Sequence, residues 1–308
     1  MWFTPEKGGP LSDTAGGAGT SFTSSVKHGV GPPSYPPSEV RHWMVCPTFW
    51  RDSLIWEPRV DRWTPHALVG TAIHAGIATL LHGLEEEPEL TATRVLGEGY
   101  VEQETWSLLT LSKLVEKGYR TLRDAIQERF QPLNPVMIEQ ADPNQDNRIV
   151  RQRRAYRVVD FVRDRAEGLE VIDWKTKINL DDIYLGEALR SVMHSWQLLD
   201  YAWHVQQWTG RPVVQAGYGL VVLGPGKPKV HWPTIRLTPE RLTQWHEQAQ
   251  AVWATMWQVE CLGHPTMNFE ACEDRHLHFG KECFLLPGCH QLCGNQELYP
   301  SLYKMKAG

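Results

Sequence analysis

Two neighbouring segments with alternating apolar side chains constrain the fold of this chain more than any other feature. Residues 156–162 and 169–175 both show this alternation, and a short polar stretch, 164–168, separates them. The pattern is typical of β-strands, in which successive side chains point to opposite faces. The sequence therefore predicts a hairpin at the centre of the fold.

Charged residues are expected to meet on this hairpin. Asp173 and Lys175 share one face of the second strand. Asp160 has the matching parity on the first strand, and folding the hairpin about Ala166 and Glu167 places it opposite Asp173. Side chains directly opposite each other have Cβ atoms roughly 4.5–5.5 Å apart, so two carboxylates would converge there.

Two carboxylates this close repel each other, and a divalent cation relieves the repulsion. Such a cation can polarise a phosphoryl oxygen and lower the pKa of bound water. Lys175 could orient that water or stabilise negative charge as it develops. This set of groups suits phosphodiester hydrolysis, although the Asp-Trp-Lys triplet alone is more common in exposed hairpins with scattered charges.

The remaining periodic segments place helices around the hairpin. Helical spacing and capping residues predict helices over 38–44, 64–81, 186–208 and 238–259, with a further helical region to about 130. More strands are expected over 135–140, 213–223 and 229–236. The expected fold is α/β, with a central mixed sheet flanked by helices, in a single domain over 38–300 that carries a helical insertion at about 85–130. Residues 1–37, rich in Gly, Pro, Ser and Thr, predict a disordered tail.

Composition and charge narrow the function classes. No apolar run approaches the roughly 18 residues of a membrane span, and the first residues lack a signal-peptide pattern, so we expect a cytoplasmic protein with no membrane partner. The net charge is −5, so nucleic acid would need a local basic patch. One stretch supplies such a patch: Arg148, Arg151, Arg153, Arg154, Arg157, Arg163 and Arg165. Most of the fourteen tryptophans are expected in the core, and exposed ones could stack on unpaired bases.

Two helices and one strand end offer further candidates. His74 lies one turn from Gly70 and could bind a metal as a neutral imidazole, although a buried histidine is more common and His66 and His82 are rivals. Gln197 and Tyr201 share a helix face and could bind a phosphate or order a water; the alternative is an ordinary amphipathic helix. Glu139 ends the strand before the hairpin, where it lies either beside the site or in solvent.

The order of these residues resembles the PD-(D/E)xK nuclease superfamily, in particular its RecB-type exonuclease branch, which includes phage exonucleases and CRISPR-adaptation nucleases. The resemblance covers about residues 38–293 and rests on Gly70-x3-His74, Glu139, Asp160, Asp173-Trp174-Lys175 and Gln197-x3-Tyr201. It implies a restriction-endonuclease-like core. It also implies that Mg²⁺ or Mn²⁺ is bound by His74, Asp160, Asp173 and the backbone carbonyl of Trp174. Lys175 would be the catalytic lysine, and Gln197 and Tyr201 the helical motif of the branch.

One departure from the family pattern lies just before the first aspartate. The family often has a glycine there, whereas Tyr156-Arg157-Val158-Val159 precedes Asp160. The metal needs the carboxylate and not the glycine.

The chain has six cysteines, and in a reducing compartment these are metal ligands or free thiols more often than disulfides. Several lie in the cysteine-rich tail, 261–293, with spacings x10, x5 and x3 from Cys272 to Cys293. By resemblance, a structural 4Fe-4S cluster would be held by Cys46, Cys272, Cys283 and Cys289. The alternatives are a local zinc site of Cys272, Cys283, Cys289 and Cys293, for which His276, His278 and His290 are possible substitute ligands, and unliganded thiols. Cys261 is expected to be an ordinary buried thiol.

The sequence thus predicts a metal-dependent DNA exonuclease that acts on DNA ends or single strands in phage or bacterial recombination, repair or replication. Arg151, Arg153 and Arg154 would follow the phosphates, and Trp196 or Trp174 would stack on bases. The alternatives are a processing nuclease of the CRISPR-adaptation type and a non-hydrolytic nucleic-acid-binding or assembly protein on the same fold. A helicase, a recombinase or a CRISPR-adaptation protein is a candidate partner. No ATP-binding loop is present, so no built-in motor is expected.

Overall fold

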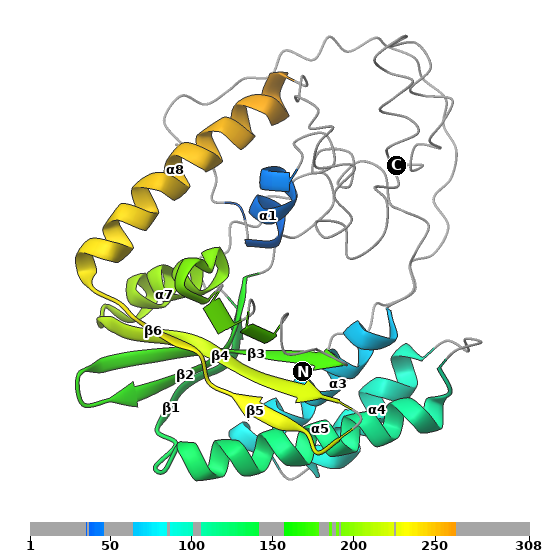
Figure 1. The fold of residues 1–308 in the computed structure, drawn as a ribbon. Coiled ribbons are helices and arrows are strands. Elements are labelled where there is room, and N and C mark those ends of the chain that lie inside the picture. The colour runs from blue at the N-terminus through cyan, green and yellow to red at the C-terminus, as the bar shows by residue number, and fades with distance from the viewer. Residues whose placement is uncertain are drawn as a thin grey trace, which may run out of the picture. The chain divides into compact units, whose positions relative to one another are not determined.

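Figure 1 shows the fold in a computed structural model of the chain. The structure describes residues 35, 37–45, 64–84, 87–100, 106–141, 157–178, 185–186, 189–190, 192–224 and 226–262. The chain divides into two compact units, 1–31 and 32–308, and every described residue belongs to the second unit.

Helices and strands follow one another in an α/β order. Along the chain the elements are α1 (Pro37–Val45), α3 (Pro65–His82), α4 (Pro88–Gly99), α5 (Leu108–Arg129), β1 (Pro135–Ala141), β2 (Val158–Arg165), β3 (Gly168–Ile178), a 3₁₀ turn (Val192–His194), α7 (Trp196–Thr209), β4 (Val213–Leu223), β5 (Lys229–His231), β6 (Thr234–Arg236) and α8 (Pro239–Leu262). None of the described helices combines the length and the apolar character that crossing a bilayer takes.

The sheet is mixed, as the sequence predicts. Its strand order is β1-β2-β3-β4-β5, and β6 also pairs with β4. Strands β3 and β4 run parallel, whereas the other pairs are antiparallel. A parallel pair needs a crossover connection, and the segment that contains α7 provides it.

Side-chain alternation along β3 divides the core into two layers. Leu169 and Val171 pack with α7 and α8 on one face of the sheet. Ile172 and Trp174 pack with α3, α4 and α5 on the other face. Figure 1 shows these three helices on the side of the sheet opposite α7. Asp173 has the parity of Leu169 and Val171 and therefore lies on the α7 face.

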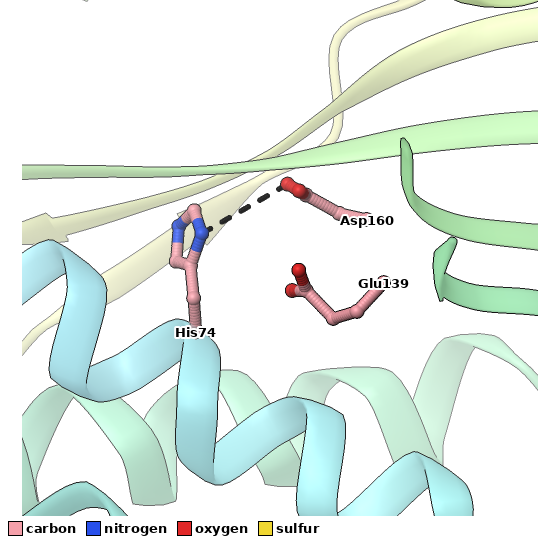
Figure 2. A group of neighbouring side chains, drawn as sticks. All are labelled: His74, Glu139 and Asp160. Atoms are coloured by element: carbon pink, nitrogen blue, oxygen red, sulfur yellow. Dashed lines mark ion pairs between the residues drawn. The ribbon is translucent and has the colours of Figure 1, made fainter. Parts of the chain in front are cut away.

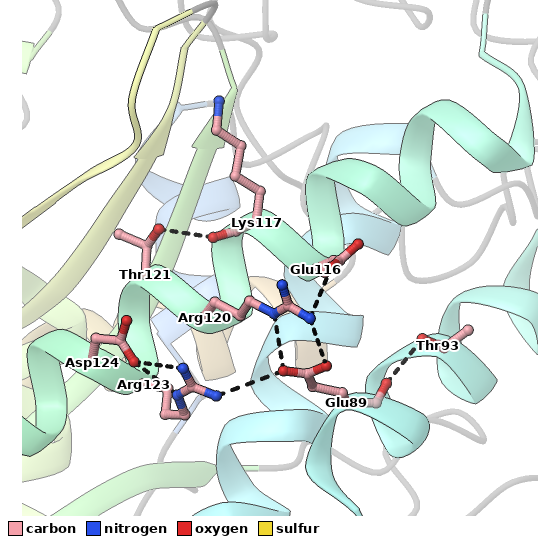
Figure 3. A network of polar contacts seen from close by, with 8 residues as sticks. All are labelled: Glu89, Thr93, Glu116, Lys117, Arg120, Thr121, Arg123 and Asp124. Carbon is pink, nitrogen blue, oxygen red and sulfur yellow. Dashed lines mark hydrogen bonds and ion pairs between the residues drawn. The ribbon is translucent and has the colours of Figure 1, made fainter.

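An ion-pair network joins α4 to α5 (Figure 3). The two carboxylate oxygens of Glu89 accept hydrogen bonds from Arg120 Nε and Nη2 at 3.1 and 3.2 Å. Arg123 Nη1 lies 3.6 Å from the same carboxylate. The hydrogen bond from Arg120 is the main reason that the pKa of Glu89 is lowered. These side chains are largely exposed, so the network contributes little to stability.

Three boundaries differ from the predicted ones. The turn of the hairpin is only Ala166-Glu167, because β2 continues to Arg165 and β3 begins at Gly168. The helix predicted from residue 186 is not continuous: residues 185–186 and 189–190 are helical, but Val192–His194 form a 3₁₀ turn. The helix α7 begins after Ser195, whose hydroxyl caps it by accepting from Leu198 N at 3.2 Å.

The predicted strand over 229–236 is divided into β5 and β6. Pro233 lies between them and has no N–H to donate to β4. Its carbonyl still accepts a hydrogen bond from Tyr218 N at 3.0 Å, so both short strands keep the same partner.

Candidate metal centre and its polar surroundings

The charged side chains of the hairpin meet where β2 and β3 part. The ladder between the strands runs from the pair Arg165 and Gly168 to the pair Phe161 and Ile172, and Asp160 comes next. Its Oδ2 accepts a hydrogen bond from the backbone N–H of Trp174 at 2.7 Å. The Asp160 carboxylate is therefore held in place by the neighbouring strand.

Asp173 is held from two sides. Lys175 Nζ lies 2.6 Å from Asp173 Oδ2. Gln197 Nε2 donates to Asp173 Oδ1 at 2.9 Å and contacts the Tyr201 hydroxyl oxygen at 3.0 Å. The structure thus brings both residues of the helical motif beside the strand that carries Asp173 and Lys175.

His74 reaches the same region from α3. Its Nδ1 lies 3.9 Å from Asp160 Oδ2 (Figure 2). One ligand atom each from His74, Glu139 and Asp160 lies within 4.8 Å of the others. The rival histidines lie elsewhere: His66 packs edge-on against Trp106, and His82 is exposed at the end of α3.

Glu139 is the residue whose place the sequence left open. Figure 2 shows its carboxylate directed towards His74 and Asp160. The residue has a φ of 46°, an unusual backbone conformation for a glutamate in a strand. The alternation pattern carries no sign of this backbone conformation, so it could not show which way the side chain points.

Burial shifts the pKa values of the imidazole and the carboxylates at this site. It lowers the pKa of His74 to about 4, so the imidazole is neutral near pH 7. Burial also raises the pKa of Asp160 and of Asp173 to about 6, against the opposing effect of Lys175. For Glu139, burial and then the charges of Asp160 and Asp173 raise the pKa to about 8.

Lys175 is the cation of this group. Burial disfavours its ammonium form, but the charge of Asp173 and the hydrogen bond to it outweigh that effect, so the pKa of Lys175 is raised. Three carboxylates, Glu139, Asp160 and Asp173, thus face one ammonium and a neutral imidazole. When all three carboxylates are ionised, their charge exceeds that of Lys175 by two.

A divalent cation fits both this charge and these donors. Carboxylate oxygens suit Mg²⁺ and Mn²⁺, and an imidazole is also acceptable to Mn²⁺. The backbone N–H of Trp174 donates to Asp160, and the Trp174 backbone also raises the pKa of His74 against the larger effect of burial, so this part of β3 lies beside the group. The metal-ligand set expected from the sequence contained Asp173; the compact group in the structure contains Glu139 instead, while Asp173 is engaged by Lys175 and Gln197.

Trp174, Trp196 and Arg157, which the sequence places at a nucleic-acid surface, pack inside the protein. The Trp174 side chain is 1% exposed and stacks on Phe161, so the expectation that it stacks on bases is wrong. Trp196 is partly buried and packs edge-on against Trp245 at 5.4 Å. Arg157 forms a buried ion pair with Asp200, with Nε 2.5 Å from Oδ2.

The other described members of the arginine stretch are also paired. Arg163 Nε lies 2.7 Å from Oε2 of the fully buried Glu170, and Arg165 Nη1 lies 3.5 Å from the same oxygen. The expectation that Arg157 belongs to a basic surface patch for nucleic acid is therefore wrong, because Arg157 is buried. Other predicted residues lie outside the described part of the chain: Arg148, Arg151, Arg153, Arg154, Cys46, Cys272, Cys283, Cys289 and Cys293.

Comparison with known proteins points to one family. The model of the PD-(D/E)XK nuclease superfamily matches residues 37–289. No curated protein matches the chain. A crystal structure of a candidate exonuclease from Eubacterium rectale is similar at 14% identity and a TM-score of 0.49, covering 86% of this chain and 95% of that one.

Proposed function

Since the chain belongs to the PD-(D/E)XK nuclease superfamily, we propose that it is a metal-dependent exonuclease that hydrolyses phosphodiester bonds at DNA ends or in single strands. One observation supports this most: Asp160, Asp173 and Lys175 converge with His74 and Glu139 at the point where two strands part. No other group of three or more potential ligand residues of this kind is found among the described residues.

His74, Glu139 and Asp160 would hold the cation, together with the backbone carbonyl of Trp174. Asp173, which is paired with Lys175, interacts electrostatically with Asp160 and His74. A bound Mg²⁺ or Mn²⁺ would polarise the phosphoryl oxygen and lower the pKa of bound water. The neutral state of His74 leaves a nitrogen lone pair for binding.

Lys175 and α7 contribute the remaining roles. The ammonium of Lys175 donates hydrogen bonds to the oxygen on which negative charge develops, or to the attacking water. Gln197 fixes the orientation of the Asp173 carboxylate through the bond at 2.9 Å, and Tyr201 lies within hydrogen-bonding distance of the same amide. Burial and the charge of Asp173 raise the pKa of Tyr201, so its hydroxyl stays protonated.

The test is cleavage of end-labelled single-stranded and double-stranded DNA with Mg²⁺, Mn²⁺ or EDTA. The matched variants are Lys175→Ala and Lys177→Ala, because Lys177 is an exposed lysine two residues along the same strand. We expect cleavage only with a divalent cation, its loss in Lys175→Ala, and its retention in Lys177→Ala. A folded wild type that binds DNA but cleaves no substrate would favour the non-hydrolytic binding or assembly function.

The biological setting is part of the proposal. Release of mononucleotides from an end supports a role in recombination, repair or replication, with a helicase or recombinase as partner. Release of fragments of one defined length instead supports processing of the CRISPR-adaptation type. RNA of the same sequence, tested beside DNA, checks the substrate class.

The cysteine site is a separate prediction. We propose that Cys46, Cys272, Cys283 and Cys289 hold a structural 4Fe-4S cluster, with zinc as the alternative and Cys293 as a possible substitute ligand. Iron, sulfide and zinc analysis of anaerobically purified protein distinguishes the two metals. A protein that contains none of them would contradict both.

A further inference from the structure

Tyr218 lies on β4, next to β3, the strand that carries Asp173 and Lys175. Strands β3 and β4 are parallel, and Tyr218 is the register partner of Asp173. Neighbours in register point to the same face of a sheet. The tyrosine therefore lies on the face that carries Asp173 and Lys175 and is covered by α7.

The two ends of the Tyr218 side chain make different contacts. Lys175 Nζ lies 5.6 Å from the centre of the ring, within the range of a cation–π interaction. A hydrogen bond of 2.5 Å joins the Tyr218 hydroxyl and Ser195 Oγ. Ser195 is the N-cap of α7, the helix that carries Gln197.

We infer that Tyr218 is a positioning residue for the proposed reaction: its ring holds the ammonium of Lys175, and its hydroxyl fixes the start of α7. This inference rests on the proposed function. In the structure Lys175 is paired with Asp173 at 2.6 Å, and that carboxylate lies next to the candidate metal centre. An aromatic ring attracts an ammonium group without neutralising its charge. The Lys175 ammonium can therefore turn from Asp173 to the substrate while it remains over the Tyr218 ring.

The hydroxyl contact links the same residue to Asp173. Ser195 Oγ also accepts the hydrogen bond from Leu198 N that caps α7. Gln197 follows Ser195 by two residues and donates to Asp173. Tyr218 therefore connects both side chains that contact Asp173, namely Lys175 through the ring and Gln197 through the helix start.

The kinetic test compares Tyr218→Phe with Tyr218→Leu. Phenylalanine keeps the ring and loses the hydroxyl, whereas leucine loses both. We expect Tyr218→Leu to lower kcat by about tenfold, and KM for DNA to stay within about twofold of the wild-type value. Tyr218→Phe should keep most of the wild-type kcat, because phenylalanine keeps the ring. Equal losses in both variants, or a loss confined to KM, would overturn the role of the ring.

The hydroxyl contact has its own test. Ser195→Ala and Tyr218→Phe each remove one side of the same hydrogen bond, so the double variant should lose less free energy of unfolding than the sum of the losses in the two single variants. Additive losses would overturn the link through Ser195.

A readout that needs no nuclease activity separates this inference from the proposed function. A methylene group near a ring face shows an upfield proton shift in NMR, so the Lys175 ε-methylene signal should be shifted upfield in the wild type. The signal is assigned by its disappearance in Lys175→Arg. It should remain shifted in Tyr218→Phe and return to the ordinary lysine position in Tyr218→Leu. An unshifted wild-type signal would overturn the inference even if the protein cleaves DNA, and an inactive wild type with the shifted signal would overturn only the proposed function.

Discussion

Asp160 combines a favourable contact with an unfavourable charge. Its carboxylate accepts the backbone hydrogen bond of Trp174, which stabilises the fold. The same carboxylate is buried, which raises its pKa to about 6, and its negative charge raises the pKa of Glu139 and of Asp173. Asparagine at this position would keep an acceptor and remove the charge.

We therefore predict that Asp160→Asn separates folding from metal binding. Without divalent cations near pH 8, its Tm should equal or exceed that of the wild type, because a buried negative charge is gone. The rise in Tm on adding Mn²⁺ and the cleavage of DNA should both be lost. Thermal unfolding with Mn²⁺ and with EDTA measures the effect. Asp164→Asn is the control, because Asp164 is an exposed residue paired with Arg211 and its loss should keep the Mn²⁺ response.

The raised pKa values predict how the difference in Tm between Asp160→Asn and the wild type depends on pH. Folding raises the pKa of Asp160 and of Asp173 from 3.8 to about 6, so the folded state binds these protons more tightly than the unfolded state. Their contribution to the free energy of unfolding is therefore lost as the pH rises from about 4 through about 6. The Tm of Asp160→Asn relative to the wild type should increase from about pH 5 to about pH 8, and the Mn²⁺ stabilisation of the wild type should increase with it. A difference that shrinks over this range would contradict the assignment of the buried carboxylates.

At the scale of single elements, α7 shows what local patterns can and cannot predict. Gln197 and Tyr201 are four residues apart, so their shared face follows from helix geometry alone. The break in the predicted helix at 192–195 was missed, although Ser195 is a strong capping residue that could have marked the start of α7. Which face turns to Asp173 depends on the packing of α7 against the sheet, and no local pattern contains that information.

The hydrogen bond from α7 to Asp173 gives a prediction for this helix. Gln197→Ala should lower kcat by roughly tenfold or more, because a bond to a charged, buried carboxylate is lost. The Tm should change little, since Gln197 is only partly buried. Gln207→Ala, an exposed glutamine on the same helix, should leave kcat unchanged. Equal activity of Gln197→Ala and wild type would show that the orientation of Asp173 does not need α7.

A glycine in β4 gives a prediction for the packing of the sheet. A Cβ at Gly219 would meet the ring of Trp174 and lie 3.0 Å from Trp232. Gly219→Ala should therefore destabilise the protein by about 1–3 kcal/mol, because the rings must move. Gly97→Ala is the control, because the position is helical, the added methyl has no neighbour within 4 Å, and alanine favours a helix. Denaturant unfolding of both variants measures the two effects, and a Gly219→Ala variant as stable as wild type would contradict the packing.

At the scale of the molecule, the candidate site lies where two packed layers meet at one strand end. His74 comes from the helices on one face of the sheet, and Gln197 comes from the helix on the other face. Strand alternation predicted the convergence of Asp160, Asp173 and Lys175 because these residues are close in the chain. The buried pair of Arg157 with Asp200 joins residues 43 positions apart, and such pairing depends on the complete fold.

The difference between local patterns and contacts made by the complete fold also explains why the position of the Glu139 side chain was not predicted. Its strand was predicted, but no local sequence pattern contains its positive φ. The family resemblance implied Asp173 as a ligand, whereas the described group contains Glu139. Sequence patterns thus predict which elements carry the chemistry, and the packing of the elements decides which side chains share the centre.

The central claim is that a cation held by His74, Glu139 and Asp160 supports cleavage. A Mn²⁺ titration tests it most directly when bound Mn²⁺, measured by electron paramagnetic resonance, and released nucleotide are followed in one sample. We predict that both signals saturate at the same Mn²⁺ concentration, that His74→Ala weakens both together, and that His82→Ala, altered at an exposed histidine of the same helix, changes neither. Cleavage that stays at the wild-type level in His74→Ala, or that proceeds without bound Mn²⁺ or Mg²⁺, would contradict the account.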